Sequence, residues 1–190
     1  MLYIMRHGIT DWNSRCKLQG RTDVPLNEEG RLMAIKAAEK YKDLSLDICF
    51  SSPLMRAYET AQLVLKGRNI PIITDERLVE MSFGSYEGSE NSFEDENNPI
   101  NVIFKNPAEY KESVGGAETF EELFKRTGEF LYDKVRPELD AGRNVLIVGH
   151  GAMNLSIIGR INKLPIEEFW SAGLKQCEIM ELKAADNFWI

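Results

Sequence analysis

The sequence is poor in the residues that cross-link small proteins or bind soft metals. Its 190 residues include two histidines and three cysteines, and Cys16, Cys49 and Cys177 are widely scattered. An odd, scattered set without a Cys-x-x-Cys spacing argues against a disulfide framework and a zinc site, and is typical of a reducing compartment. We therefore expect a cytoplasmic protein without a soft-ligand metal centre, while carboxylate sites for magnesium stay open.

Long apolar runs and an excess of basic residues are also missing. No stretch approaches the length that crosses a bilayer, and a strand candidate starts directly after Met1, so we expect neither a membrane span nor a signal peptide. Acidic residues outnumber basic ones by 30 to 23, which argues against a nucleic-acid partner. The length suits one domain, residues 1–190, and nothing in the sequence indicates an oligomeric state.

What the sequence does contain is a short apolar run that ends in functional side chains. Residues 2–5 form a run typical of a buried strand, and Arg6, His7 and Gly8 follow directly. In parallel sheets, ligands bind beyond the carboxyl ends of the strands. We therefore expect Arg6 and His7 to face a binding site.

The same construction recurs late in the chain. Residues 145–148 form a second apolar run, followed by Gly149, His150 and Gly151. Both histidines thus precede a glycine, which chance produces roughly once in two hundred cases if glycine supplies about 7% of residues. We expect the two imidazoles to meet at one crevice. The alternative is two unrelated histidines that each find a partner at a strand end.

A further basic group stands at the start of a predicted helix. Ser52 is typical of an N-cap and Pro53 of the first helical position, which places Arg56 in the opening turn. Free N–H groups and the helix dipole favour an anion there, and an arginine adds a bidentate donor. Alternatively, Arg56 faces solvent or pairs with Glu59 or Glu76.

Periodicity predicts the other elements. Helices are expected at 27–43, with Asn27 as N-cap, and at 52–67, 118–139 and 151–161, and strands at 47–51, 70–74 and, on an edge, 177–182. In the first helix, Leu32, Ile35 and Ala38 recur at helical spacing. The order of elements predicts an α/β fold, a three-layer α/β/α sandwich with a mostly parallel central sheet.

Residues 85–117 break this periodicity and carry most of the net charge. Seven acidic residues and two lysines give the segment a net charge of -5, against -7 for the whole chain. Its length is typical of a functional excursion, with short helices expected at 99–104 and 107–111. We interpret it as an inserted lid or specificity segment, and the alternative is a solvated surface loop.

The predicted crevice indicates a phosphoryl ligand. Two arginines, two histidines and the N-termini of the helices after residues 52 and 150 would make an anion-seeking site in an acidic protein. Histidine can be the nucleophile of phosphoryl transfer when one ring nitrogen is held and the other keeps its lone pair. No G-x-S-x-G elbow is present, which disfavours acyl transfer.

Four stretches resemble the histidine phosphatase superfamily, also called phosphoglycerate mutase-like. Residues 6–13, RHGITDWN, are similar to its R-H-G-x-T-x-W-N signature, and residues 51–61, SSPLMRAYETA, to its S-S-x-x-x-R-A-x-x-T-A helix start. Residues 80–88, EMSFGSYEG, resemble its E-x-x-F-G-x-x-E-G loop, and residues 149–151 its second histidine. The matches follow the family's order over nearly the whole chain.

The resemblance implies a role for each matching residue. His7 would be the nucleophile that becomes phosphohistidine, and Glu80 the general acid, although without the motif Glu80 reads as a surface carboxylate beside a turn. Arg6, Arg56 and His150 would bind the phosphoryl oxygens. The positions that would line the phosphate or substrate are Asn13, Gln19, Gly20 and Gly151. These cations replace a metal, so we expect an enzyme without metal or cofactor.

Departures from the family pattern favour one branch of its chemistry. Mutases resemble one another in an E-R-x-Y-G sequence and an H-G-N-x-x-R sequence, where this chain has Met81, Ala152 and Leu155. We therefore expect a phosphomonoester hydrolase that acts on small phosphorylated metabolites, with mutase-type transfer as the alternative. A non-catalytic phosphate-binding module is a further alternative, but it predicts damage to the nucleophile, acid or arginines, and all of these are intact.

Overall fold

A five-stranded mixed sheet forms the centre of the molecule. The structure is a computed structural model that describes residues 1–90 and 97–183. The strands are β1 (Leu2–Arg6), β2 (Ile48–Ser51), β3 (Ile72–Thr74), β4 (Val145–Gly149) and β5 (Ile179–Leu182). Their order is β3-β2-β4-β1-β5, and β5 runs antiparallel to β1 while the other pairs are parallel. The predicted edge strand near the end of the chain is therefore confirmed.

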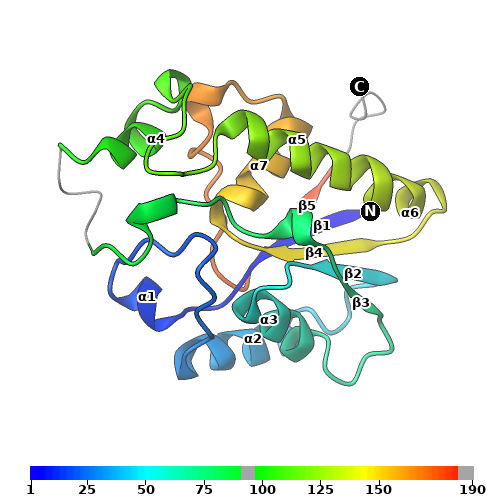
Figure 1. The fold of residues 1–190 in the computed structure, drawn as a ribbon. Helices are drawn as coiled ribbons and strands as arrows, with labels where there is room; N and C mark the ends of the chain where they lie inside the picture. The colour runs from blue at the N-terminus through cyan, green and yellow to red at the C-terminus, as the bar shows by residue number, and fades with distance from the viewer. Residues whose placement is uncertain (91–96, 184–190) are drawn as a thin grey trace.

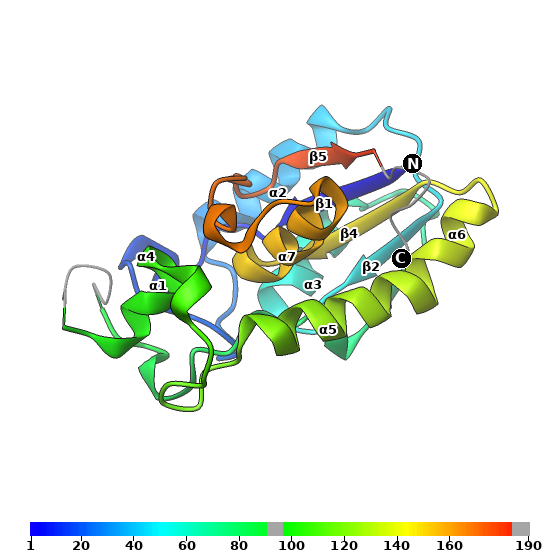
Figure 2. The ribbon, with the colours of Figure 1, turned by 90° about the horizontal axis from the view of Figure 1, so that it is seen from above.

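Helices cover both faces of the sheet, which confirms the three-layer sandwich (Figure 1). On one face lie α2 (Glu28–Lys40) and α3 (Met55–Val64), and on the other lie α5 (Phe120–Phe130) and α7 (Gly151–Asn162). Figure 2 shows the sheet from above, with α5 and α7 side by side over it. The shorter helices are α1 (Asp11–Ser14), α4 (Val102–Lys105) and α6 (Arg136–Asp140).

The inner strands β1, β2 and β4 are buried on both faces because their side chains alternate between two apolar cores. Towards α5 and α7 point Leu2, Ile4, Ile48, Phe50, Val145 and Ile147. Towards α2 and α3 point Tyr3, Met5, Cys49, Leu146 and Val148. This arrangement explains why the strands read as continuous apolar runs in the sequence.

The buried face of α2 differs from the prediction. Leu32 and Ile35 are 56% and 49% exposed, and the buried positions are Gly30, Ala34 and Ala37. Small side chains let the helix lie directly on the backbone that follows β1. A Cβ on Gly30 would come within 2.1 Å of the Ile9 carbonyl oxygen. Close backbone packing therefore decides the orientation of α2, against the larger apolar side chains.

The helix predicted at 118–139 is present but contains an irregular turn. α5 starts at Phe120 with Thr119 as N-cap, and residues Leu131–Val135 form a π-helical turn that leads into α6. The helical path continues through Pro137 to Asp140, close to the predicted end at residue 139. Pro137 lacks an N–H and its ring crowds the preceding turn, and the wider π turn accommodates it.

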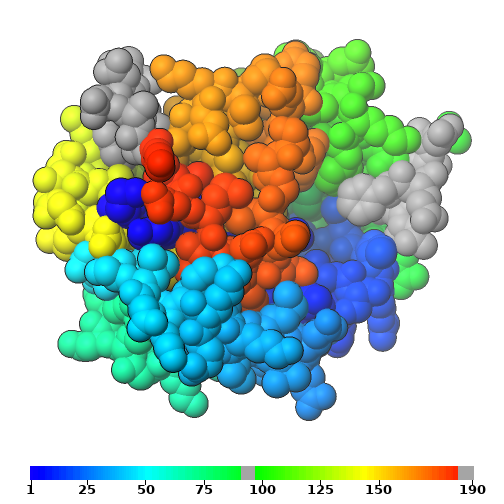
Figure 3. Space-filling model, turned by 180° about the vertical axis from the view of Figure 1, so that it is seen from behind, coloured from blue at the N-terminus to red at the C-terminus, as the bar shows by residue number. Residues whose placement is uncertain are grey.

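The segment predicted as an insertion contains the short helices expected of it. Pro99–Asn101 and Pro107–Glu109 are 3-10 turns on either side of α4. Its acidic run at residues 94–96 lies outside the described residues. From behind, the orange and red chain that leads to β5 lies across the middle of the surface (Figure 3). None of the helices that the structure describes is long and apolar enough to cross a bilayer.

Candidate active site

The two histidines stand at the ends of neighbouring strands. In the register of β1 and β4, Arg6 is opposite Gly149, so His7 and His150 follow paired positions. The backbone N–H of His7 donates to the Gly149 carbonyl oxygen at 2.9 Å. Both imidazoles are buried, and their ring centroids lie 5.1 Å apart at 61°. The alternative of two unrelated histidines is therefore wrong.

His7 is held as a neutral imidazole whose two ring nitrogens have defined roles. Its Nδ1 lies 2.7 Å from the Gly8 carbonyl oxygen, and a carbonyl only accepts, so the ring hydrogen sits on Nδ1 and Nε2 keeps its lone pair. Burial, and then the charges of Arg56 and Arg6, hold the pKa of His7 well below its ordinary value. A neutral imidazole whose Nε2 keeps its lone pair is the form that can attack phosphorus.

Arg56 organises the side of the site next to His7. It is fully buried, its Nε donates to His7 Nε2 at 3.3 Å, and its terminal nitrogens donate to the carbonyl oxygens of Gly20 and Thr22 at 2.7 and 2.9 Å. The alternative of a solvent-facing Arg56 is wrong, and Glu59 pairs with Arg31 instead. The guanidinium is thus fixed against the nucleophile by the loop that follows α1.

The start of α3 differs from the prediction. The helix begins at Met55 and ends at Val64, with Leu54 at the N-cap position, rather than running from Ser52 to Gly67. The Met55 N–H donates to the Asp23 carboxylate at 2.8 Å. The Ser52 hydroxyl accepts from the Leu54 N–H at 3.3 Å, before the helix starts, and lies 2.7 Å from His150 Nε2. The side chain predicted to cap the helix therefore holds the second histidine.

His150 and Arg6 each have a buried nitrogen at the site. Among the residues that the structure describes, His150 Nδ1 and Arg6 Nε find no hydrogen-bond partner. Burial, followed by the charge of Arg56, lowers the pKa of His150 well below its ordinary value. Burial also lowers the pKa of Arg6, an effect that the Glu80 carboxylate opposes. Buried polar atoms of this kind commonly mark a functional site.

Glu80 occupies the N-terminus of α7. Its Oε1 accepts from the backbone N–H groups of Met81 and Met153 at 2.8 and 2.9 Å, and its Oε2 accepts from Ala152 at 3.2 Å. The side chain is buried, so a role as a surface carboxylate is wrong. Two helix N-termini were expected to face the ligand. The carboxylates of Asp23 and Glu80 cap them instead, so positive side chains, rather than helix ends, remain for a phosphate.

Asn13 and Gln19 present amide groups whose oxygens are already engaged. The Asn13 Oδ1 accepts from Thr10 and, at 3.1 Å, from the Gln176 amide. The Gln19 Oε1 accepts from the Thr10 hydroxyl at 2.9 Å. Because the oxygens are held, the NH₂ groups are left as donors. Both residues line the cavity.

Two glycines at the cavity have different reasons to lack a side chain. Gly20 has a φ of +56°, and a Cβ there would meet the Glu87 carboxylate. A Cβ on Gly151 would lie 3.3 Å from Glu80 Oε2. Gly20 therefore shapes the loop whose carbonyl fixes Arg56. Gly151 leaves space beside the carboxylate.

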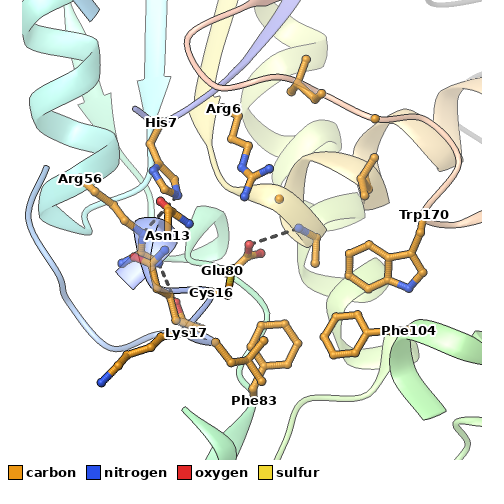
Figure 4. A pocket seen from close by; sticks show the side chains of 18 residues that line it. Arg6, His7, Asn13, Cys16, Lys17, Arg56, Glu80, Phe83, Phe104 and Trp170 are labelled. Carbon is orange, nitrogen blue, oxygen red and sulfur yellow. Dashed lines mark hydrogen bonds between the residues drawn. The ribbon is translucent and has the colours of Figure 1, made fainter. Parts of the chain in front are cut away.

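One cavity of about 460 Å³ joins the predicted residues. It is lined by Arg6, His7, Asn13, Gln19, Gly20, Arg56, Glu80 and Gly151, while His150 reaches it through its contact with His7. Figure 4 shows Arg6, His7, Arg56 and Glu80 pointing into it. Among residues 1–90 and 97–183, no group of three or more His, Cys, Asp or Glu side chains is arranged to hold a metal ion.

Several supporting residues were not predicted. The Thr60 hydroxyl accepts from the Gly8 N–H at 3.1 Å, and Glu87 accepts from the backbone N–H groups of Arg21, Thr22 and Phe83. Thr10, Thr60 and Glu87 are letters of the motifs quoted above, so the motifs could have indicated them. Glu87 holds the loop that fixes Arg56, and we therefore interpret its role as structural.

An ion cluster around the buried Glu118, next to the backbone of Glu80, carries no motif signal. Glu118 accepts from Arg21 at 3.0 Å and from Arg126 at 2.6 and 2.9 Å. The Arg21 Nε in turn donates to the Glu80 carbonyl oxygen at 3.3 Å. The partners are far apart in the sequence, so only the fold reveals that they fix the backbone of Glu80.

The fold and the site define an α/β protein with an anion-seeking crevice at the ends of its central strands. A model of the histidine phosphatase superfamily (branch 1) matches residues 2–190, and the chain belongs to this superfamily. It is 35% identical to the uncharacterized phosphatase PhoE of Bacillus subtilis over 161 residues, 84% of this chain and 76% of the relative. It is 32% identical to the 2,3-bisphosphoglycerate-dependent phosphoglycerate mutase of Cytophaga hutchinsonii over 170 residues, 88% and 80% of the two chains.

A solved structure agrees with this assignment. The mycobacterial glucosyl-3-phosphoglycerate phosphatase, in a complex with VO3, superposes with a TM-score of 0.80 at 27% identity, covering 94% of this chain and 90% of that chain. The relatives are named both as phosphatases and as mutases, which supports an enzyme. They leave open which of the two reactions this chain performs.

Proposed function

We propose that the protein hydrolyses small phosphomonoesters through a phosphohistidine on His7. The observation that carries the proposal is the fixed ring of His7, with Nδ1 held by Gly8 and Nε2 placed beside Arg56. A buried neutral imidazole is a competent nucleophile, and the cations around it stabilise charge on the phosphoryl oxygens. This charge inventory also supports a reaction that needs no metal and no cofactor.

The reaction has two steps. In the first, His7 Nε2 attacks phosphorus, the N–P bond forms and the P–O ester bond breaks while Glu80 gives its proton to the leaving oxygen. In the second, water attacks phosphorus and gives a proton to the Glu80 carboxylate, while the N–P bond breaks and phosphate leaves. We assign the proton to Oε2, because it accepts one backbone hydrogen bond where Oε1 accepts two.

Mutase-type transfer is the second candidate, and the similarity to a named mutase favours it. A mutase must hold its intermediate against release. On the side of α7, the cavity is lined by Ala152 and Leu155. The resemblance places an asparagine and an arginine at these two positions in mutases. Apolar side chains give a second anionic group no partner. This composition supports hydrolysis.

The test is to trap the intermediate. After rapid mixing with substrate and quenching, mass spectrometry should find an acid-labile, alkali-stable phosphoryl group on His7, and the His7→Ala variant should lack it. Released phosphate and interconversion of 2- and 3-phosphoglycerate are measured in parallel. A phosphoryl group on serine or cysteine, or full activity of the His7→Ala protein, would contradict the proposal. Interconversion that outpaces phosphate release would favour the mutase.

A further inference from the structure

The cavity has a second wall that the catalytic proposal does not use. Opposite the histidines it is lined by Leu18, Phe83, Phe104, Leu155, Trp170 and Leu174, which we call the apolar wall. These side chains come from the loop after α1, the stretch after Glu80, α4, α7 and the chain between α7 and β5. Five separate parts of the chain thus place large apolar groups at one site.

The three aromatic rings of the apolar wall form a continuous surface. The ring centroids of Phe83 and Phe104 lie 5.7 Å apart, and those of Phe104 and Trp170 lie 5.1 Å apart. The Trp170 Nε1–H donates to the Ile103 carbonyl oxygen at 2.7 Å, which ties its polar end to the backbone. Figure 4 shows the rings together, on the far side of Glu80 from His7.

Charge is distributed unevenly over the cavity. Arg6 and Arg56 stand with the histidines, and Lys17 is paired with Glu90 at 3.1 Å. The apolar wall itself contributes only uncharged side chains among the lining residues of the described chain. A carboxylate or second phosphate bound against these rings would lose its water without gaining a partner, which costs free energy.

We propose that the apolar wall is the subsite for the alcohol part of the substrate, and that it selects phosphomonoesters whose alcohol carries an uncharged aromatic group. The inference rests on the proposed function for the phosphoryl position and adds the chemistry of the other end. Flat rings stack on aromatic side chains, and their burial contributes to affinity. A substrate with a second anion on its alcohol is rejected by the same wall.

Binding tests this separately from hydrolysis. Phosphonates keep a C–P bond that a phosphatase does not cleave, so calorimetry can compare 1-naphthylmethylphosphonate with methylphosphonate on the wild-type protein. The naphthyl compound should bind about ten- to a hundredfold more tightly, as expected for burying an aromatic group. Equal affinity for the two phosphonates would overturn the subsite.

Two variants locate the effect. Phe104→Ala should reduce the preference for the naphthyl compound about tenfold or more. The matched control Tyr132→Ala removes a ring that is 54% exposed on the π turn, and it should keep the wild-type ratio. Circular dichroism spectra and melting curves establish that both variants are folded. A Phe104→Ala ratio equal to that of the control would overturn the assignment of the wall.

A charge introduced into the wall provides an independent test. Leu155→Arg places a cation among the rings and should shift the preference from the naphthyl compound towards 3-phosphonopropionate, which carries a carboxylate. An unchanged order of affinities contradicts the inference. Selective binding without turnover of naphthyl phosphate would overturn the proposed hydrolysis and leave the subsite standing. Turnover of naphthyl and methyl phosphate with equal kcat/KM would overturn the subsite and leave the hydrolysis standing.

Discussion

The two walls of the cavity are built on opposite principles. On the side of His7, which we call the charged wall, side chains are held by directed hydrogen bonds: His7 by Gly8, Arg56 by two carbonyl oxygens, and Glu80 by three N–H groups. On the apolar wall, contacts between rings carry no such direction. A change to the charged wall should therefore alter the reaction by orders of magnitude, and a change to the apolar wall should alter substrate preference by degrees.

The largest effect on the reaction should come from removing Glu80, the proton donor of the charged wall. A general acid matters most for a poor leaving group, so Glu80→Gln should slow phosphoenzyme formation from an alkyl phosphate by about a hundred- to ten-thousandfold. The same step with p-nitrophenyl phosphate should slow much less, because its phenolate leaves without a proton. Stopped-flow and quenched-flow measurements of the first turnover separate this step from water attack.

The matched control is Glu87→Gln. The Glu87 carboxylate holds the backbone at residues 21, 22 and 83 and therefore supports Arg56 rather than the leaving group. Its loss should slow both substrates by a similar factor. Equal losses for the two leaving groups in the Glu80→Gln protein would remove Glu80 from the role of acid.

Acid should destabilise the charged wall through its two neutral histidines. In the unfolded chain an imidazole titrates near about 6.5, whereas burial holds the pKa of both His7 and His150 below that value in the fold. Below that pH the unfolded chain binds protons that the folded protein excludes. The free energy of unfolding should then fall by up to about 1.4 kcal/mol per histidine for each pH unit.

Urea denaturation between about pH 7.5 and about pH 5.5 measures this loss. The His7→Gln/His150→Gln double variant keeps every carboxylate, so its loss over the same range supplies the baseline. Parallel curves for the wild type and the double variant would show that the histidines are not buried as neutral groups.

The smallest expected effect is that of a chelator. If Arg6, Arg56 and His150 supply the positive charge that the phosphoryl oxygens need, dialysis against EDTA should leave kcat/KM unchanged. Vanadate, which can adopt the five-coordinate geometry of the transition state, should inhibit the dialysed enzyme. An activity lost on dialysis and restored by magnesium would show that the charged wall is not sufficient by itself.

The same contrast explains what the sequence could and could not predict. Strand-end pairs such as Arg6–His7 and Gly149–His150 are local signals, and the sheet brings them together by topology alone. The apolar wall has no local signal, because Phe83, Phe104 and Trp170 come from separate segments. The Glu118 cluster was missed for the same reason.

Errors arose where one side chain had two possible partners. Ser52 fits the sequence pattern of an N-cap, but its hydroxyl lies against His150 while Asp23 bonds the start of α3. The apolar residues Leu32 and Ile35 indicated the wrong face of α2, because the smaller residues allow closer backbone packing. A local pattern therefore indicates which partners or buried faces are possible, and tertiary contacts determine which of them forms.

The contact between α2 and the chain after His7 has a consequence for mutational tolerance. A Cβ on Gly8 would come within 2.6 Å of the Gly30 carbonyl oxygen, just as a Cβ on Gly30 would meet the Ile9 carbonyl oxygen. The two glycines therefore share one steric constraint, although only Gly8 belongs to a catalytic motif. In a library of single substitutions scored for activity, Gly30 should be as intolerant as Gly8, whereas the neighbouring Leu32 should accept almost any residue.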